Sequence, residues 1–322
     1  MSQSTNDPDA LTLAPVTQDV KPQGFIARHA FPILLLGLVG SGFSPIFVRL
    51  SEVGPIATGA NRLTLPVPLF FALLWLRPQD RVASTSTQPR HDMWLLLLSG
   101  VFFCCDLLFW NSSVMITSVA NAAVLANITP VFVVAGGWIL FKDKPGKLFL
   151  VGLAIALVGS AIMMAQSLAL GGRSVVGDLS AVVAAAFYSG YVLTLSRVRK
   201  RVSVTATMAY GGTMSAVLLI AAAVVMEPQL WPHTFHGWMV AVGMVVLAQL
   251  AGQMLIAASL AHVPAGLAAA LFLLQPVIPA GAAWVLFGEK VTLYQVLGSI
   301  ALLTGLEISR RGTIKPGTLK KA

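Results

Sequence analysis

Two residues of opposite charge lie inside strongly apolar stretches of the sequence. Asp106 is flanked by FFCC and LLFW, and Arg62 by AN and LTLP. If these stretches cross a membrane, a charge near their centre costs on the order of 2.5–3.5 kcal/mol, so each side chain should face a cavity or a partner. Asp106 is therefore a candidate to carry a coupling proton or to hold an amine. The alternative is a neutral acid that is hydrogen-bonded between helices.

Arg62 also has more than one interpretation. Its guanidinium group can hold a carboxylate or a phosphate through two parallel hydrogen bonds. It can instead extend to the polar edge of the membrane, or pair with Glu52 or Asp106. The sequence leaves anion binding and structural pairing open.

Neutral polar and aromatic residues recur near the centres of the same apolar stretches. Gln249 and Gln253 are four residues apart, which puts them on one helix face, and Tyr188 and Tyr191 are three apart. Any of these side chains could simply join two membrane helices, a contact worth about 0.6–2 kcal/mol. As a set they predict a hydrogen-bonding cavity with aromatic walls. The candidate cavity residues are Ser44, Asp106, Asn127, Tyr188, Tyr191, Gln249, Gln253 and Gln275.

Three prolines fall in the middle of apolar stretches, at Pro130, Pro276 and Pro279. Each removes one backbone donor from a helix, and in a membrane the freed carbonyl must find a neighbour or cavity water. We expect kinks that open carbonyl groups to the cavity and let half-helices swing during gating. Static helix curvature is the alternative.

The composition explains why these residues stand out. Charged residues make up 10% of the chain and hydrophobic residues 57%, whereas ordinary soluble domains are roughly 25% charged. The chain is therefore predicted to be an all-α integral membrane protein in a lipid bilayer. A membrane helix needs about 20 residues. The ten candidate transmembrane helices are 31–50, 56–76, 94–115, 118–141, 147–167, 177–196, 204–226, 237–260, 264–287 and 292–309.

The sequence lacks motifs for other chemistry. It has no Walker A loop, HExxH motif or nucleophile elbow. The adjacent Cys104 and Cys105 indicate packing rather than a disulfide framework or a metal site. The net charge of +9 comes from short loops and the two ends, so it need not mean nucleic acid. We expect a small-molecule substrate, no cofactor, no metal and no nucleic-acid partner, and keep a homodimer as a candidate oligomer.

A long-range repeat organises the ten stretches. Residues 122–144 return as residues 268–290, so that Pro130 corresponds to Pro276. Each copy holds five predicted spans. Because five is odd, the second copy should enter the membrane upside down, an arrangement typical of secondary transporters. The predicted parts are a flexible cytoplasmic tail (1–30), a first five-helix repeat (31–167), a second five-helix repeat (177–309) and a basic cytoplasmic tail (310–322).

The basic residues give an orientation. Most of the 21 Lys and Arg residues fall in the tails and in the loops that share the side of the N-terminus. Cytoplasmic loops carry an excess of Lys and Arg. Both termini are therefore predicted to be cytoplasmic, in the cytoplasmic (inner) membrane of a bacterium.

Several of these features occur together in one family. They are the mid-span prolines, the ending WVLFGEK at 284–290, and Arg62 near the start of the second span. Gly-rich spans follow, with Gly152, Gly159, Gly298 and Gly305. In these features the chain resembles the drug/metabolite transporter superfamily, in the branch with two EamA-type repeats. The resemblance implies a central cavity among spans one, three, four, six, eight and nine, with spans five and ten more peripheral.

By resemblance, the function is movement of a small metabolite, often export, driven by a gradient or by exchange. We predict a secondary transporter, an exporter of amino acids or related compounds that works by alternating access of its two inverted repeats, and no enzyme. An intramembrane enzyme acting on a lipid-borne substrate is one alternative. It would need clustered His, Asp and Glu at the membrane face, whereas His233, His236 and His262 are scattered. A non-transporting membrane scaffold is the other.

Overall fold

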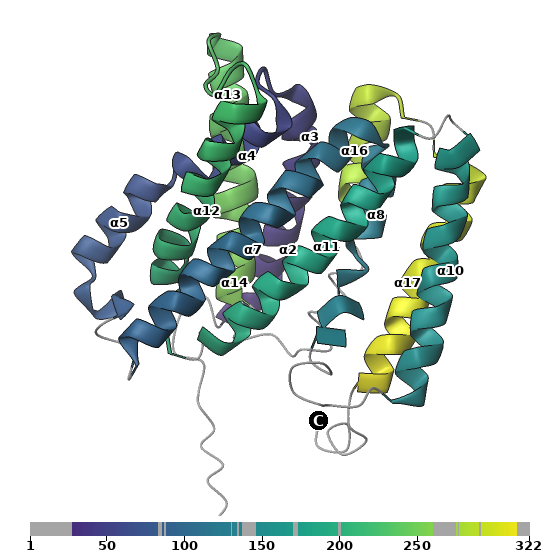
Figure 1. The fold of residues 1–322 in the computed structure, drawn as a ribbon, viewed down its shortest axis with the longest axis horizontal. Helices are drawn as coiled ribbons and strands as arrows, with labels where there is room; N and C mark the ends of the chain where they lie inside the picture. The colour runs from purple at the N-terminus through teal and green to yellow at the C-terminus, as the bar shows by residue number, and fades with distance from the viewer. Residues whose placement is uncertain are drawn as a thin grey trace, which may run out of the picture.

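The computed structural model describes residues 28–82, 86, 88–129, 131–133, 135–136, 146–169, 173–198, 201–259, 275, 277–289 and 291–313. The predicted tails lie mostly outside these residues. The described part is built from helices (Figure 1). They are α2 (Ala30–Gly42), α3 (Ser44–Leu50), α4 (Pro55–Thr64), α5 (Val67–Leu76), η1 (Pro78–Asp80), α7 (Pro89–Ile116), α8 (Val119–Ala126), α10 (Lys147–Ala169), α11 (Arg173–Val198), α12 (Val204–Met226), α13 (Phe235–Gly243), the π-helix η2 (Met244–Met254), α14 (Leu255–Ser259), α16 (Val277–Phe287) and α17 (Leu293–Thr313).

Within the described residues, six helical stretches are long and apolar enough to cross a membrane. They are Ala30–Leu50, Pro55–Leu76, Pro89–Ile116, Arg173–Leu195, Val204–Met226 and Phe235–Met254. Shorter apolar helices at Lys147–Ile162, Val277–Phe287 and Leu293–Ser309 lie in three further predicted spans. Large apolar side chains point outward, with Trp75 73% and Val225 84% exposed, as a lipid-facing surface requires. The all-α membrane architecture is confirmed, and the count of ten spans stays a prediction.

Prolines divide the first two spans into shorter helices. Pro45 lies in the first turn of α3, and Pro68 in the first turn of α5. In a first turn the missing N–H costs little, because that group has no partner within the helix. The second break lies just past Arg62, which is in the last turn of α4.

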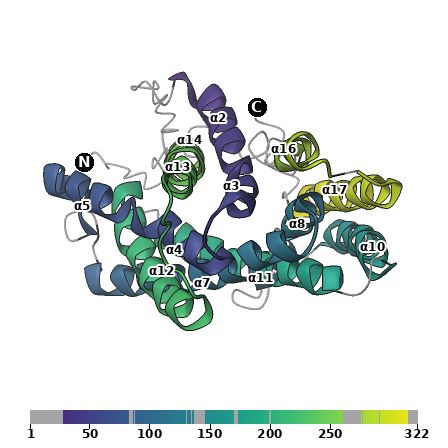
Figure 2. The same cartoon turned by 90° about the horizontal axis from the view of Figure 1, so that it is seen from above.

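Helices α10 and α17 lie side by side at one edge of the molecule (Figures 1 and 2). Glycines allow their backbones to come close. A Cβ atom on Gly159 would lie 2.6 Å from the carbonyl oxygen of Gly298, and one on Gly305 would lie 2.6 Å from that of Gly152. Small residues of this kind are typical of close membrane-helix contacts. This pair forms the peripheral part of the fold.

The opposite part of the molecule is built around α4, α7 and α12. Leu63, Leu107 and Leu219 form part of its buried core, and Ser215 Oγ of α12 donates to the Gly100 carbonyl of α7 at 2.7 Å. Helix α2 packs against η2, where a Cβ atom on Gly252 would lie 2.8 Å from the Ser41 nitrogen. π-Helical turns are uncommon and often occur at functional sites.

Candidate functional site

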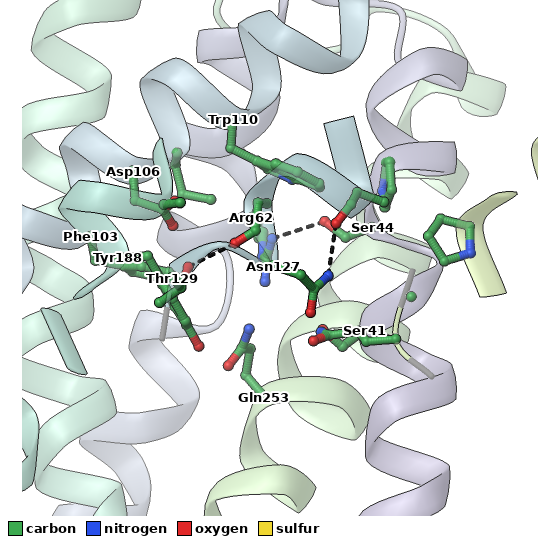
Figure 3. Close-up of a pocket in the computed structure, with 18 residues that line it drawn as sticks. Ser41, Ser44, Arg62, Phe103, Asp106, Trp110, Asn127, Thr129, Tyr188 and Gln253 are labelled. Carbon is green, nitrogen blue, oxygen red and sulfur yellow. Dashed lines mark hydrogen bonds between the residues drawn. The ribbon is translucent and has the colours of Figure 1, made fainter. Parts of the chain in front are cut away.

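A cavity of about 250 Å³ lies between the two halves of the chain (Figure 3). Its lining comes from α2, α3, α4, α7 and α8 of the first half, and from α11, η2, Gln275 and α16 of the second. Pockets for drug-sized ligands hold roughly 300–1,000 Å³. The volume therefore suits a small metabolite.

Arg62 enters this cavity from α4 and is 4% exposed. Its Nε donates to Gln249 Oε1 at 3.0 Å, and its Nη1 donates to Ser44 Oγ at 2.9 Å. Both acceptors are neutral, so they orient the guanidinium group without cancelling its charge. Extension of this side chain to the membrane edge, one of the sequence interpretations, is wrong, because α4 packs against α7, α12 and η2 and Arg62 is buried.

The structure places Glu52 apart from Arg62, whereas the charges of Arg62 and Asp106 interact without direct contact. None of the ion pairs between described residues joins Arg62 to either acid. Glu52 lies in the loop before α4, where it accepts hydrogen bonds from Thr234 Oγ1 at 2.7 Å and from backbone N–H groups. Asp106 lies on α7 and lines the same cavity (Figure 3).

Asp106 is 9% exposed and lines the cavity. Within the described part of the chain, no hydrogen bond or direct ion pair engages its carboxyl group, although its charge interacts with that of Arg62. A buried polar group without a partner is costly unless a ligand or water satisfies it. The cavity thus has a guanidinium group and a carboxyl group in its lining, and each keeps bonding capacity toward the enclosed space.

An aromatic wall covers one side of the cavity. Phe103 and Tyr188 line it, as does Trp110 (Figure 3). Tyr191 lies behind them, stacked on Phe103 with ring centroids 4.9 Å apart and 5.5 Å from the ring of Tyr188. Such contacts fix the ring orientations and give the cavity a rigid apolar face.

Amides and hydroxyls line the remaining wall. Gln275 Nε2 donates to Ser41 Oγ at 3.4 Å, and Asn127 Nδ2 donates to the Ala123 carbonyl at 2.8 Å. Gln253 of η2 also faces the cavity (Figure 3). These groups surround the two charges with neutral donors and acceptors.

The structure brings most of the predicted residues together. Those that line the cavity are Ser44, Arg62, Asp106, Asn127, Tyr188, Gln253, Gln275 and Pro279. Gln249 and Tyr191 lie one layer behind, where they support Arg62 and Phe103. Pro130 and Pro276 lie outside the described residues. Substrate binding by the lining residues and gating by the prolines stay predictions.

Several lining residues were not predicted from the sequence: Ser41, Phe103, Trp110 and Thr129. The sequence does hold a pattern that could have identified Phe103 and Trp110. Phe103 and Trp110 are three residues before and four residues after Asp106, so all three share one face of α7. Ser41 and Thr129 carry no comparable pattern.

Among the described residues, no three His, Cys, Asp or Glu side chains lie close enough together to hold a metal ion. Cys104 is buried in the core between α4, α7 and α12, in agreement with its predicted packing role.

Comparison with known proteins gives similarities to a family, to a bacterial transporter and to a solved structure. The sequence profile of the EamA-like transporter family matches residues 30–165 and again residues 175–310. The "Uncharacterized transporter YwfM" of Bacillus subtilis (strain 168) is 25% identical over 276 residues, which cover 83% of this chain and 88% of that protein. A solved structure described only as "Crystal structure of protein" has a TM-score of 0.59 at 17% identity, covering 88% of this chain and 97% of its own. At that identity the likeness shows the fold alone.

Proposed function

Because the chain belongs to the EamA-like transporter family, with both halves matched, we propose that it is a secondary transporter that moves small metabolites through the cavity between its two repeats. The observation that carries this proposal is that one basic and one acidic side chain, Arg62 and Asp106, line the same small cavity. Two buried charges in a membrane helix bundle are costly. Their retention is explained if a substrate bridges them.

The substrate class that fits best is an amino acid or a related zwitterion. A substrate carboxylate can accept hydrogen bonds from the Nη groups of Arg62, which Gln249 and Ser44 hold in place. A substrate ammonium can donate to Asp106. Such charge-assisted hydrogen bonds are about twice as strong as neutral ones. Phe103, Tyr188 and Trp110 then face the substrate side chain, so apolar or aromatic amino acids should bind best.

Alternating access is the mechanism that we infer from the two repeats. Inverted repeats are two related halves that can exchange conformations around a fixed midplane site. Helices α8 and α16, which both line the cavity, lie in the first and in the second copy of the sequence repeat. Rocking of these halves would expose the site to one side and then to the other. We propose export as the direction, and Asp106 can also carry the coupling proton in the state without substrate.

The protein is an integral membrane protein. We propose the bacterial cytoplasmic membrane as its location, with both termini inside, on the basis of the loop charges. On this orientation the upper end in Figure 1, which holds the end of α3 and the start of α8, faces outward. A homodimer stays a prediction.

Thermal unfolding of the detergent-purified protein tests the proposal. Ligands that bind only the folded state raise its stability by mass action. We expect saturable stabilisation by apolar amino acids, and little by the matching amines or carboxylic acids alone. Asp106→Asn should shift this stabilisation to ligand concentrations roughly 10- to 150-fold higher. Ser160→Ala, which removes a buried hydroxyl on α10 away from the cavity, is the matched control. Stabilisation at unchanged ligand concentrations in Asp106→Asn would show that the zwitterion assignment is wrong.

A further inference from the structure

Arg49 connects three segments at one end of the cavity. It lies in the last turn of α3. Its Nε donates to the Val114 carbonyl at 3.0 Å, and its Nη2 donates to the Thr117 carbonyl at 2.7 Å. Its Nη1 forms an ion pair with Glu289, which follows α16. All three guanidinium nitrogens are therefore engaged, and they join α3, the end of α7 and the end of α16.

Glu289 extends this connection to α8. Its Oε2 and Oε1 accept from the Val119 N–H, at 3.2 and 3.4 Å. Val119 is the first residue of α8, and a carboxylate at a helix N-terminus is favoured by both the free N–H groups and the helix dipole. One carboxylate thus binds α3 through Arg49 and α8 through its backbone.

The local sequence explains how Glu289 takes this position. Gly288 has φ of +63°, a left-handed conformation that glycine adopts without steric cost. The Glu289 N–H then donates back to the Ala283 carbonyl at 3.4 Å, as in a glycine-terminated helix end. The turn directs the carboxylate from the end of α16 toward α8.

Three of the joined helices, α3, α8 and α16, are walls of the cavity. Ser44 of α3, Ala123 of α8 and Pro279 of α16 all line it. Arg49 is five residues beyond Ser44, and Val119 is four residues before Ala123, which corresponds to about 6–7.5 Å along a helix. The Arg49–Glu289 pair therefore lies beyond the cavity at the end where α8 and α16 would have to separate.

We propose that the Arg49–Glu289 pair is the outer gate of the transporter: it holds α3, α8 and α16 together when the cavity is closed to the outside and breaks when it opens. The inference rests on the proposed alternating-access transport. The two side chains are 22% and 19% exposed. Water can therefore solvate both charges when they part, which an enclosed pair would not allow.

Labelling of a cavity cysteine measures this opening without a substrate. The background is Cys104→Ala with Cys105→Ala, and the reporter is Ala126→Cys, at a position that lines the cavity. The probe is a charged, membrane-impermeant methanethiosulfonate, added to right-side-out or to inside-out vesicles. We expect Arg49→Gln and Glu289→Gln each to raise the labelling rate several-fold from the outside and to lower it from the inside.

Faster labelling from the outside together with slower labelling from the inside distinguishes a gate from a general loosening of the fold. A variant that is merely destabilised would label faster from both sides, and that result would overturn the proposal, as would unchanged labelling from the outside. Glu307→Gln is the matched control, because it removes another Arg–Glu pair, with Arg311, on exposed α17. It should label like the parent. If the glutamine variants do not fold, Arg49→Lys keeps the charge but not the forked contacts, and must still shift labelling toward the outside.

This experiment is independent of the substrate assignment. A shift in labelling together with no stabilisation by zwitterions would support the gate and reject the proposed substrate class. Stabilisation by zwitterions with unchanged labelling would support the proposed substrate class and reject the gate.

Discussion

Arg62, in the first half of the chain, donates a side-chain hydrogen bond to Gln249 in the second half. Nε of Arg62 on α4 donates to Oε1 of Gln249 on η2 at 3.0 Å, across 187 positions of sequence. Both side chains are nearly fully buried. The cation of the proposed binding site is thus oriented by the opposite repeat, so movement of one repeat against the other would change its position.

Substitutions of Gln249 should separate the orientation of Arg62 from its charge. Gln249→Leu leaves the buried Nε without an acceptor, which should lower the free energy of unfolding by about 1–3 kcal/mol. Gln249→Glu supplies an acceptor but pairs the cation, so the fold should be retained and binding of carboxylate-bearing ligands lost. Thermal unfolding with and without amino acids checks both outcomes. Normal ligand stabilisation in Gln249→Glu would contradict a role for the Arg62 charge.

Asp106→Asn should weaken binding of zwitterions without unfolding the protein. The amide keeps the size of the carboxylate and loses its charge. A hydrogen bond to a charged group contributes about 1.5–3 kcal/mol, which corresponds to roughly 10- to 150-fold in affinity. Titration of ligand affinity in the parent and the variant measures the change. Transport by the variant with its pH dependence fully intact would exclude Asp106 as the proton carrier.

Larger residues at the glycine contact of α10 and α17 should destabilise the peripheral pair. In Gly159→Ala, the new Cβ would lie 2.6 Å from the Gly298 carbonyl, and overpacking of this kind typically costs about 1–3 kcal/mol. Gly281→Ala is the matched control on α16, because nothing lies within 4 Å of its Cβ position. Comparison of the two midpoints of thermal unfolding tests the prediction. Equal midpoints would mean that the helices can move apart at no cost.

The loop carboxylate of Glu52 should add a small pH dependence at acidic pH. Hydrogen bonds from the Thr234 side chain, then from the Thr234 backbone, hold the pKa of Glu52 below its usual value of 4.5. A lowered folded-state pKa gives stability that is present above the usual value and is lost as the pH falls through the lowered one. Thr234→Ala should therefore be less stable than the parent at pH 6. The difference should shrink below pH 4, as followed by thermal unfolding. A difference that does not depend on pH would exclude this linkage.

Polarity was the signal that singled out residues in the sequence. Asp106 and Gln275, two cavity candidates, and Arg62, a candidate for anion pairing, stand out because polar groups are costly in apolar spans, and the structure places all three in the cavity lining. The prediction was less accurate where a side chain could face either of two neighbours. Gln249 shares a span with Gln253, yet it lies behind Arg62 rather than in the cavity.

The pairing of the two proposed gate residues could not be predicted from the sequence. Arg49 and Glu289 lie 240 positions apart, and each sits at a span end, where a charge in contact with water is unremarkable. Asp92 and Asp178 are similar: both lie near helix starts and both are completely buried. Charged residues near span ends have no local pattern that tells a buried partner from a solvated one.

The sequence by itself determined the membrane class, the two-fold repeat and the rare polar groups inside apolar spans, because each of these depends on composition or spacing along the chain. Only the tertiary structure decided which polar groups meet. The π-helical turn η2 and the close approach of α2 at Gly252 set where Gln249 and Gln253 point. The positive φ of Gly288 directs Glu289 to Arg49 and to the start of α8. Such partners come from helices far apart in sequence, and their contacts follow from packing that no local pattern encodes.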